Sequence, residues 1–421
     1  MRILVSNIGS TSFKFRLFEF QGGQERELAA GSVDRIGGSA DGTLTFRLGG
    51  AGSTGILPVS PAGETPATRH TRPCRCADHG QAIRACLDEL ADAGVLADAA
   101  DLSAVAFKAV MAGDCEPAVL VDEKVLAAME YYTPAAPAHN PAYIAAMRSF
   151  RQALGPAMPL VAAFEPGFHR TIPPRRWRYA IPWEWQEKYG IRRYGYHGAS
   201  HRYVSQRVAQ LMPLKSRRVI SCHLGGSSSV CAVLEGKSVA TSMGFSPQTG
   251  LPQGTRVGDF DPYALALVAR QTGMTLEQML AELGGNGGLA ALSGTSGDGR
   301  DIEQAAAAGD QRATLALEAL ATAVRDCIGA YLAEMGGADS IAFTGGMGEK
   351  SPLLRSMICR NLEFAGVWLD SPRNQQAAGE VTIHSTRSQV AVWVMPTNEE
   401  LVVARQAAEL LAGLAARKAQ G

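Results

Sequence analysis

Six short segments of the chain combine charged or imidazole side chains with glycine or proline. Because glycine and proline favour turns, we expect these side chains to lie in turns rather than in the middle of helices or strands. One polar turn would be ordinary, but six of them in an otherwise apolar chain exceed what solvated loops require. They are APAHNP (136–141), AAFEPGFH (162–169), RRYGYHGASH (192–201), GTRVGDFDP (254–262), SGTSGDGRD (293–301) and PTNEE (396–400).

Three other segments are rich in glycine and serine and follow β-strand patterns: IGSTS (8–12), LGGSSS (224–229) and GGMG (345–348). A glycine-rich loop after a strand can present backbone N–H groups to phosphate. Phosphoryl transfer needs such amides, Mg²⁺ held by oxygen ligands, cations on the transferring group and an aligned acceptor. The loops and the polar turns together point to phosphoryl-transfer chemistry.

Each candidate side chain also has a structural interpretation. His197 alone could be a hydrogen-bonded structural histidine, and Arg256 could form a salt bridge within its loop to Asp259 or Asp261. Glu399 could be an acid at a helix N-terminus, where the helix dipole favours it. We predict structural roles for three further histidines, His169, His201 and His223.

The elements around these segments predict a duplicated α/β architecture. RILVSN (2–7), a Gly/Ser loop and the alternating FKFRLFEF (13–20) read as a hairpin, and RVISCH (218–223) with VCAVLEG (230–236) repeats this layout. Two unrelated hairpins remain the alternative. Helical spacing predicts helices at 263–272, 313–335, 353–366 and 399–418, the second of them buried.

Residues 51–76 differ from the rest, being rich in Gly, Pro, Ser, Thr and Arg without periodicity. We expect a surface insertion without regular structure. His70, Cys74, Cys76 and His79 invite a zinc interpretation. Cys-x-Cys is not the usual two-residue gap and no second pair supports it, so a plain loop is favoured.

Length and composition limit the remaining possibilities. At 421 residues, two domains are expected. Lys+Arg and Asp+Glu each number 40, so charge gives no argument for nucleic acid or a membrane surface as a partner. With neither a secretory signal pattern nor a run of 18 apolar residues, the eight cysteines indicate reduced thiols in a cytoplasmic protein.

At these motifs the chain resembles the acetate kinase family of the acetate-and-sugar-kinase, heat-shock and actin superfamily. Five family patterns, NxGSSSxK, RRYGFHGTSH, TSMGFTP, MGTRSGDIDP and IPTNEEL, occur in the family's order. They read here NIGSTSFK (7–14), RRYGYHGASH (192–201), TSMGFSP (241–247), QGTRVGDFDP (253–262) and MPTNEEL (395–401).

The resemblance implies an α/β fold of two duplicated actin-like (ribonuclease-H-like) domains with an interdomain cleft. Residues 1–164, with the insertion 51–76, would form the acyl-substrate domain, joined by the C-terminal helix 400–421. Residues 165–399 would bind the nucleotide. The resemblance also implies ATP/ADP and Mg²⁺ as cofactors, a short-chain carboxylate such as acetate or propionate as acceptor, and a homodimer.

The resemblance assigns roles to matching positions. Catalytic roles fall on Arg256, His197, Glu165 and Lys108, and metal binding on Asn7 and Glu399. The acyl substrate would contact Lys108, Val110, Ala138, His139, Tyr196 and Pro247. The nucleotide would contact Lys14, Gly225, Gly226, Ser227, Asp298, Arg300, Gly345, Gly346 and Gly348.

Departures from the family pattern gather on the acceptor side. Lys108 replaces an arginine, keeping the charge but losing the bidentate fork, and Glu165 replaces an aspartate. Ala138 replaces a leucine and Tyr196 a phenylalanine, which suggests room beyond a methyl group and adds a polar group.

On the donor side, Gly226, Ser227 and Lys350 also depart from the pattern. Three hypotheses therefore remain open at this point. The chain is a carboxylate kinase, a kinase for another small acid or phosphoryl donor, or a nucleotide-binding regulatory homologue with weak or no catalysis.

Overall fold

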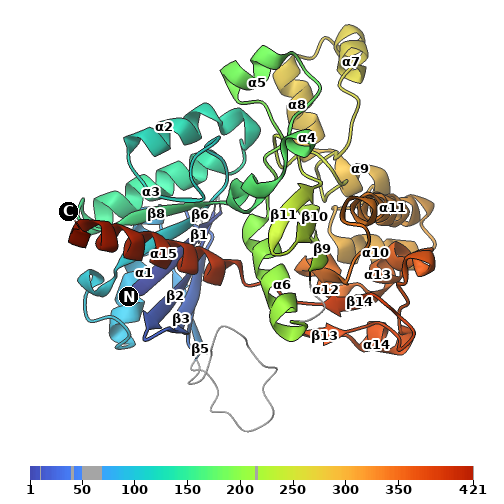
Figure 1. Cartoon of the computed structure of the whole chain (residues 1–421). Coiled ribbons are helices and arrows are strands. Elements are labelled where there is room, and N and C mark those ends of the chain that lie inside the picture. Colours follow the sequence, from blue (N-terminus) through green and yellow to red (C-terminus); the bar gives the residue numbers. More distant parts are fainter. Residues whose placement is uncertain (10, 39–41, 50–68, 214–216, 421) are drawn as a thin grey trace. The chain divides into compact units, whose positions relative to one another are not determined.

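The structure is a computed structural model that describes residues 1–9, 11–38, 42–49, 69–213 and 217–420 (Figure 1). The chain divides into two compact units, Met1–Gly167 with Asn398–Gly421, and Phe168–Thr397. Each unit is built around its own β-sheet. The predicted fold class, a mixed α/β chain with two sheets, is confirmed.

The first unit contains an eight-stranded sheet of order β5-β4-β3-β2-β1-β6-β8-β7. Strands β1 to β5 form an antiparallel meander, β1, β6 and β8 run parallel, and β7 is antiparallel to β8. The strands are β1 (Arg2–Ile8), β2 (Ser12–Gln21), β3 (Gln24–Asp34), β4 (Gly42–Leu48), β5 (Arg69–Cys74), β6 (Ala104–Ala109), β7 (Ala118–Leu120) and β8 (Leu160–Phe164).

Alternation along β2 determines which helix covers each face of this sheet. Phe13 points to one face, where its ring lies 5.9 Å from that of Phe150 in α3. Arg16 points to the other face and lies 4.0 Å from Glu400 at the start of α15. Helices α3 and α15 therefore cover opposite faces. The described part of the unit contains the helices α1 (His79–Asp92), α2 (Glu123–Tyr131), α3 (Asn140–Leu154) and α15 (Glu399–Gln420), with 3₁₀ turns η1 (Ala99–Asp101) and η2 (Thr133–Ala135). The 3₁₀ turn η3 (Glu165–Thr171) leads from the first unit into the second.

The second unit contains a six-stranded sheet of order β11-β10-β9-β12-β14-β13. Its strands are β9 (Arg218–Leu224), β10 (Ser228–Leu234), β11 (Lys237–Thr241), β12 (Ser340–Thr344), β13 (Val381–Thr382) and β14 (Ala391–Val394). Its helices are α4 (Pro174–Trp177), α5 (Trp183–Tyr189), α6 (Gly198–Leu211), α7 (Ala264–Thr272), α8 (Leu276–Gly285), α9 (Gly288–Ser293), α10 (Gly299–Ala307), α11 (Gln311–Met335), α12 (Gly345–Lys350), α13 (Pro352–Cys359) and α14 (Ser371–Gln376).

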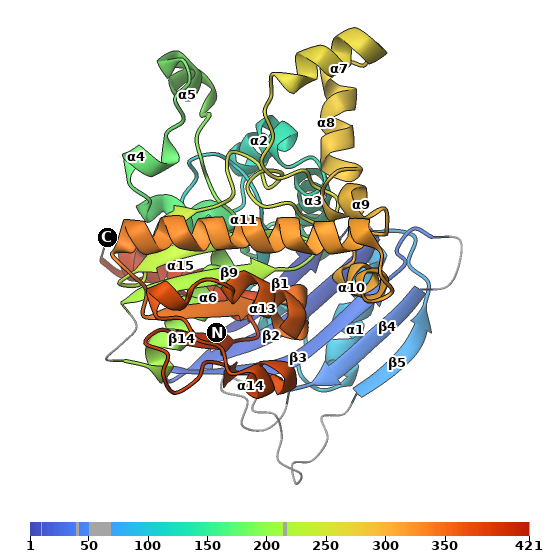
Figure 2. The ribbon, with the colours of Figure 1, turned by 90° about the vertical axis from the view of Figure 1, so that its right-hand side faces the viewer.

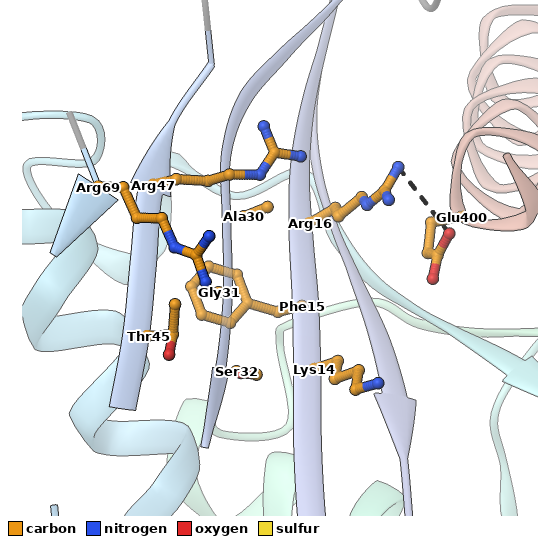
Figure 3. Close-up of a pocket in the computed structure, with 10 residues that line it drawn as sticks. All are labelled: Lys14, Phe15, Arg16, Ala30, Gly31, Ser32, Thr45, Arg47, Arg69 and Glu400. Atoms are coloured by element: carbon orange, nitrogen blue, oxygen red, sulfur yellow. Dashed lines mark ion pairs between the residues drawn. The ribbon is translucent and has the colours of Figure 1, made fainter. Parts of the chain in front are cut away.

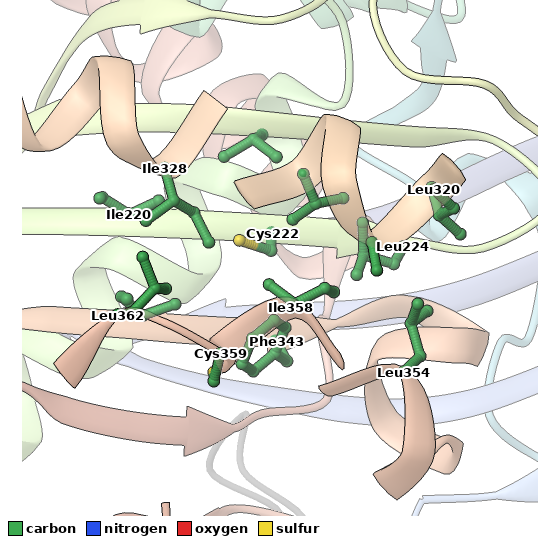
Figure 4. Close-up of a cluster of buried hydrophobic side chains, with 14 of the residues drawn as sticks. Ile220, Cys222, Leu224, Leu320, Ile328, Phe343, Leu354, Ile358, Cys359 and Leu362 are labelled. Atoms are coloured by element: carbon green, nitrogen blue, oxygen red, sulfur yellow. The ribbon is translucent and has the colours of Figure 1, made fainter. Parts of the chain in front are cut away.

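Helix α11 forms the core of the second unit against one face of this sheet (Figures 2 and 4). Ile220 and Cys222 of β9 pack in one buried cluster with Leu320 and Ile328 of α11. Ser221, between them, points to the opposite face and meets α6. The alanine-rich sequence of α11 thus gives the buried helix that its spacing predicted.

The two units share the predicted hairpin. In the first unit β1 pairs antiparallel with β2 and parallel with β6. In the second, β9 pairs antiparallel with β10 and parallel with β12. The segments 8–12 and 224–229 therefore connect corresponding strands of a repeated α/β layout.

Two local predictions were wrong. Gly345–Lys350 is the short helix α12 rather than a loop. The helix predicted at 353–366 ends at Cys359, because the backbone of Arg360 leaves the helical region (ψ 134°) and Asn361 then takes a left-handed conformation (φ 65°). The 3₁₀ turn η4 (Glu363–Ala365) follows.

The prediction for the insertion was also partly wrong. Arg69–Cys74 is the edge strand β5, paired with β4, rather than irregular chain. The alternation in RHTRPC lets Arg69 and Thr71 share one face of the sheet while His70 and Arg72 share the other. Residues 51–68 of the predicted insertion lie outside the described part of the chain.

A buried arginine connects α12, α13 and α14. Arg355 of α13 is 1% exposed. Its guanidinium donates to Asn374 Oδ1 at 2.7 Å and to the carbonyls of Gly348 (2.9 Å), Glu349 (3.0 Å) and Asn374 (2.8 Å). Burial lowers the pKa of Arg355. Nothing in the sequence distinguished this arginine, yet it holds the end of α12 in place.

We expect Arg355→Leu to lower the free energy of unfolding of the second unit by about 3–5 kcal/mol, because four buried acceptors would lose their donor. Urea denaturation followed by tryptophan fluorescence measures this, since all five tryptophans lie in that unit. Arg360→Leu, at an exposed position, is the matched control. Equal stability of the two variants would contradict the assignment.

Candidate functional site

In the first unit, the predicted site residues lie at the ends of neighbouring elements. Lys108 lies near the end of β6 and Glu165 directly follows β8, its parallel neighbour. Glu399 begins α15. Because parallel strands end at the same edge of a sheet, Lys108 and Glu165 are brought to one place.

Lys108 and Glu399 form an ion pair, with Nζ 2.5 Å from Oε2. Burial disfavours the charge on the lysine. The carboxylates of Glu399 and Glu165 outweigh that effect and hold the pKa of Lys108 well above its ordinary value. The lysine therefore remains an ammonium group at any physiological pH.

Asn7, at the end of β1, is oriented by a residue that the motifs did not identify. Tyr143 Oη donates to Asn7 Oδ1 at 3.1 Å. Burial raises the pKa of Tyr143 to about 12, so the phenol keeps its proton. Lys14 is the register partner of Asn7 across the β1–β2 hairpin. The only sequence signal for Tyr143 was its position one turn after the HNP segment.

The remaining acyl-side residues of this unit are placed at element boundaries. Val110 follows β6 and is buried. His139 immediately precedes α3, which starts with Asn140, and Ala138 before it is exposed.

In the second unit, His197 has an unusual backbone. It takes φ 56° and ψ 28°, the left-handed region, directly before α6. For a non-glycine residue this conformation costs on the order of 1–3 kcal/mol and persists where the surroundings require it. Backbone strain of this kind is typical of functional positions.

The ring of His197 is held by two neighbours. Its Nδ1 lies 2.8 Å from Ser229 Oγ in β10. The ring stacks on that of His223, with centroids 4.2 Å apart. Ser229 also lies 2.8 Å from Nε2 of His201, whose Nδ1 is 2.9 Å from Ser221 Oγ. Ser229 thus orients His197 and is itself shared with His201, a contact that the glycine-loop pattern did not reveal.

His201 and His169 are buried with both ring nitrogens hydrogen-bonded. His169 Nδ1 lies 2.8 Å from Ser238 Oγ and Nε2 lies 2.9 Å from the carbonyl of Tyr196. Burial lowers the pKa of His169 to about 4, and that of His201 well below its ordinary value. Both rings are therefore neutral near pH 7.

Arg256 is a largely buried cation with neutral partners. Its Nη1 donates to Ser227 Oγ at 3.0 Å, Gln253 Oε1 at 3.3 Å and the Pro247 carbonyl at 3.5 Å. Burial lowers its pKa. In the described part of the chain, no carboxylate pairs with it, so the loop salt bridge to Asp259 or Asp261 does not form.

Glycines allow the Arg256 loop to approach two others closely. A Cβ on Gly254 would meet the carbonyls of Gly226 and Gly297 at 3.2 and 3.3 Å. Gly288 has φ 62°, and a Cβ there would meet the carbonyls of Gln253 and Arg256 at 2.1 and 2.6 Å. Main-chain packing therefore brings three predicted segments together: 224–229, 253–256 and 297–300.

A cavity of about 360 Å³ opens beside these loops within the second unit. Predicted nucleotide residues lining it include Gly225, Gly226, Asp298, Arg300 and Gly346. Met347, Lys350 and Ser351 line it from α12 and the residue before α13, and Gly297, Gly299 and Glu303 from α10 and the segment before it. Gly345 and Gly348 lie in α12 but are not among its lining residues.

Asp298 is the N-cap of α10 and accepts from the Arg300 amide at 2.9 Å. It also forms an ion pair with the Arg300 guanidinium at 2.7 Å. These bonds lower the pKa of Asp298 to about 2. The pair presents a carboxylate and a guanidinium at the rim of the cavity.

Tyr196 and Pro247 are both predicted to contact the acyl group. Pro247 lies in the segment after β11, and Tyr196 is hydrogen-bonded to that segment. Tyr196 Oη donates to the Phe245 carbonyl at 2.6 Å, and burial raises its pKa. The Pro247 carbonyl accepts from Gln253 Nε2 at 2.8 Å. The hydroxyl that departs from the family pattern thus has a main-chain partner.

The four residues of the zinc interpretation have other contacts. His70 Nε2 lies 2.5 Å from Glu89 Oε1, and His79 Nε2 lies 3.1 Å from the Gly9 carbonyl. Cys74 and Cys76 have their sulfurs 3.5 Å apart. Among the residues that the structure describes, no group of three or more His, Cys, Asp or Glu could hold a metal ion, and no helix could cross a membrane.

A chain with two α/β units of this topology, a glycine-lined cavity and buried cations at loop ends defines a phosphotransferase. A profile of the acetokinase family matches residues 2–405. The chain is 39% identical over 412 residues to the acetate kinase of Anoxybacillus flavithermus, covering 97% of this chain and 98% of that protein. The chain belongs to the acetokinase family, as its motifs predicted.

Two solved structures are similar over nearly their whole length. The acetate kinase of Porphyromonas gingivalis has TM-score 0.82 at 33% identity, covering 97% of this chain and 99% of that chain. A propionate kinase from Francisella tularensis has TM-score 0.83 at 32% identity, covering 96% and 98%.

We expect acid to destabilise the second unit through His169. Its pKa is about 4 when folded and 6.5 ordinarily, so between these values the unfolded chain binds a proton that the folded chain does not. Stability present above pH 6.5 is lost as the pH falls, by about 2 kcal/mol between pH 7.5 and 5. His201 acts in the same direction.

Urea titrations at the two pH values, followed by tryptophan fluorescence, measure this loss in the parent and in His169→Gln. Glutamine does not titrate, so the pH-dependent loss should be smaller by about the amount above, whatever the stability of the variant at pH 7.5. An unchanged pH dependence would contradict the assignment.

Proposed function

We propose that this protein transfers a phosphoryl group reversibly between ATP and a short-chain carboxylate, acetate or propionate, giving an acyl phosphate and ADP. The observation that carries the proposal is Arg256, a mostly buried guanidinium whose partners are all neutral. A buried charge without a counter-ion is costly, so the position favours an anionic ligand.

A guanidinium suits both anions of this reaction. Its planar fork donates two parallel hydrogen bonds to a carboxylate or to phosphoryl oxygens. In the forward reaction a carboxylate oxygen attacks the γ-phosphorus and the bond from that phosphorus to the ADP oxygen breaks. Arg256 would hold the acceptor in line and stabilise charge on the equatorial oxygens.

His197 would act beside Arg256. Ser229 and the stacked His223 hold its ring in one orientation, and the left-handed backbone of His197 sets the direction in which the side chain leaves the main chain. We propose that the ring donates a hydrogen bond to the transferring phosphoryl group. Pre-organised donors of this kind stabilise charge that develops in the transition state.

The cavity at Gly226, Asp298 and Gly346 would hold the adenosine part of the nucleotide. About 360 Å³ is within the range of small-molecule sites. Asp298 and Arg300 together offer an acceptor and donors to ribose and base, and the glycines of 224–229 leave their amides accessible to phosphates.

The first unit would supply the metal ligands. Mg²⁺ prefers oxygen donors and is often bound through one or two carboxylates together with substrate phosphates. The Asn7 amide oxygen, fixed by Tyr143, and the Glu399 carboxylate fit this donor set, with Glu165 nearby. These residues would hold a Mg²⁺ ion that would supply positive charge against the phosphate oxygens.

Lys108 and Glu165 would serve the acceptor. A lysine held as an ammonium group can pair with the substrate carboxylate, though as a point charge rather than a fork. Val110, Ala138, His139, Tyr196 and Pro247 would surround the acyl chain. The small side chain of Ala138 allows propionate as well as acetate, and the similar proteins of known structure include acetate kinases and a propionate kinase.

We further propose that the protein is a homodimer of the cytoplasm. Large apolar side chains are exposed on α5, α7 and α8 of the second unit, with Tyr263 86% and Leu267 62% exposed. Helices α7 and α8 contact each other, and exposed apolar surface on such a pair indicates an interface. All eight cysteines are free thiols, as in a reducing compartment.

The test of the reaction is a hydroxamate assay that traps acyl phosphate, with ATP and Mg²⁺ and with acetate, propionate, butyrate or lactate. We expect product from acetate or propionate. Arg256→Ala should lower kcat/KM at least about 100-fold, as expected for loss of a transition-state donor. Arg360→Ala, an exposed arginine of the same unit, should retain full activity. The absence of product with every acid would overturn the proposal.

Light scattering after size exclusion tests the dimer. The double variant Leu267→Asp, Leu280→Asp should be monomeric, because charges would replace two exposed leucines of α7 and α8. Leu315→Asp, at a leucine of α11 with 53% exposure, is the control and should remain dimeric. A double variant that remains a dimer would contradict this interface.

A further inference from the structure

Four basic side chains, Lys14, Arg16, Arg47 and Arg69, share one face of the first sheet, and three of them have no role in the site described above. The strand register places Arg16, Ala30, Arg47 and Arg69 in one row across β2, β3, β4 and β5. The next row on the same face contains Lys14, Ser32, Thr45 and Thr71.

The two rows form a groove with a low floor and basic walls (Figure 3). Ala30 and Ser32 in the central strand β3 have short side chains and form the floor. Lys14 and Arg16 rise on one side, and Arg47 and Arg69 on the other. The cavity measures about 400 Å³. Its size and lining match a small ligand with several negative charges.

The charges of the groove are not balanced. Arg47 and Arg69 are direct register partners, an arrangement of like charges that destabilises a sheet. Glu27 offsets part of this, since its carboxylate lies 2.5 Å from Arg47 and 3.5 Å from Arg16. Glu400 adds a second acid, 4.0 Å from Arg16.

Lys14 and Arg69 have no carboxylate partner in the described part of the chain. The four cations and two carboxylates leave two positive charges in excess.

We propose that this groove binds a short inorganic oligophosphate. One guanidinium group can donate two parallel hydrogen bonds to the oxygens of a phosphate. Arg47 and Arg69 present two of them from adjacent strands, whose spacing is about 4.8 Å. Hydroxyls of Ser32 and Thr45 lie between the basic walls as further donors. Arg69 belongs to the segment 51–76, which stands outside the family motifs quoted above.

The groove has a consequence for catalysis that rests on the proposed function. Lys14 lines the groove and is also the register partner of Asn7 in the candidate phosphate and metal loop. An oligophosphate that engages Lys14 would compete with the nucleotide for the same ammonium group. Occupancy of the groove should therefore raise the apparent KM for ATP.

Isothermal titration of the full-length protein with sodium tripolyphosphate, without Mg²⁺ and at 0.05 and 0.15 M salt, tests the site. We expect Arg69→Gln to weaken binding about tenfold, as for one lost charge-assisted pair. Arg75→Gln, an exposed arginine just beyond β5 with the same charge change, should bind as the parent does. Equal affinity of Arg69→Gln and the parent would overturn the proposal.

Two further variants separate the possible failures. Arg47→Lys keeps the charge beside Glu27, so it should fold, and it should weaken tripolyphosphate binding by removing the fork. Arg256→Ala should retain groove binding even if it loses acyl phosphate formation. Binding that disappears in Arg256→Ala but persists in Arg69→Gln would place the oligophosphate at the catalytic arginine and refute the groove.

Inhibition kinetics test the consequence for ATP. Tripolyphosphate should raise the apparent KM for ATP in the parent at least several-fold more than in Arg69→Gln, with Arg75→Gln behaving as the parent. Equal inhibition of all three proteins would refute the competition through Lys14, while the calorimetric result would still decide the groove itself. An enzyme inactive on every carboxylate would refute the proposed function without affecting the titration.

Discussion

A positive charge held largely out of water without a carboxylate partner is the constraint around which the second unit is organised. The Arg256 guanidinium has only the hydroxyl of Ser227, the amide oxygen of Gln253 and one carbonyl to receive its protons. Neutral acceptors orient such a cation but do not neutralise it. The loops around the guanidinium must therefore be rigid enough to keep this charge in place.

Close packing between the main chains of the neighbouring loops provides this rigidity. Gly254 meets Gly226 and Gly297, and Gly288 lies against the carbonyls of Gln253 and Arg256. The hairpin β9–β10 carries both the glycine segment and Ser229, which orients His197. The β9–β10 hairpin thus contacts His197 through Ser229, and its connecting glycines, Gly225 and Gly226, line the cavity of about 360 Å³. The same hairpin layout in the first unit places Asn7 opposite Lys14.

The buried cation of the first unit, Lys108, has a different environment from Arg256. Lys108 is paired with Glu399 and lies near Glu165, so its charge is balanced inside the protein. Lys108 already has carboxylate neighbours, whereas the partners of the Arg256 guanidinium are neutral groups. The basic groove of β2 to β5 is a third case, in which partial compensation by Glu27 leaves an excess of charge on an open sheet face.

The sequence by itself determined the family, the two-sheet α/β class, the paired hairpins and the elements that carry the motifs, because strand alternation, helical spacing and glycine loops are local and periodic. The family motifs favoured a catalytic role for Arg256, but only the structure shows that its partners in the described part of the chain are neutral groups rather than Asp259 or Asp261. Tyr143, Ser229, Arg355 and the row from Arg16 to Arg69 also depended on the tertiary structure. Each arises from contacts between segments far apart in the chain, and strand register, which places such side chains together, is decided only when the sheet forms.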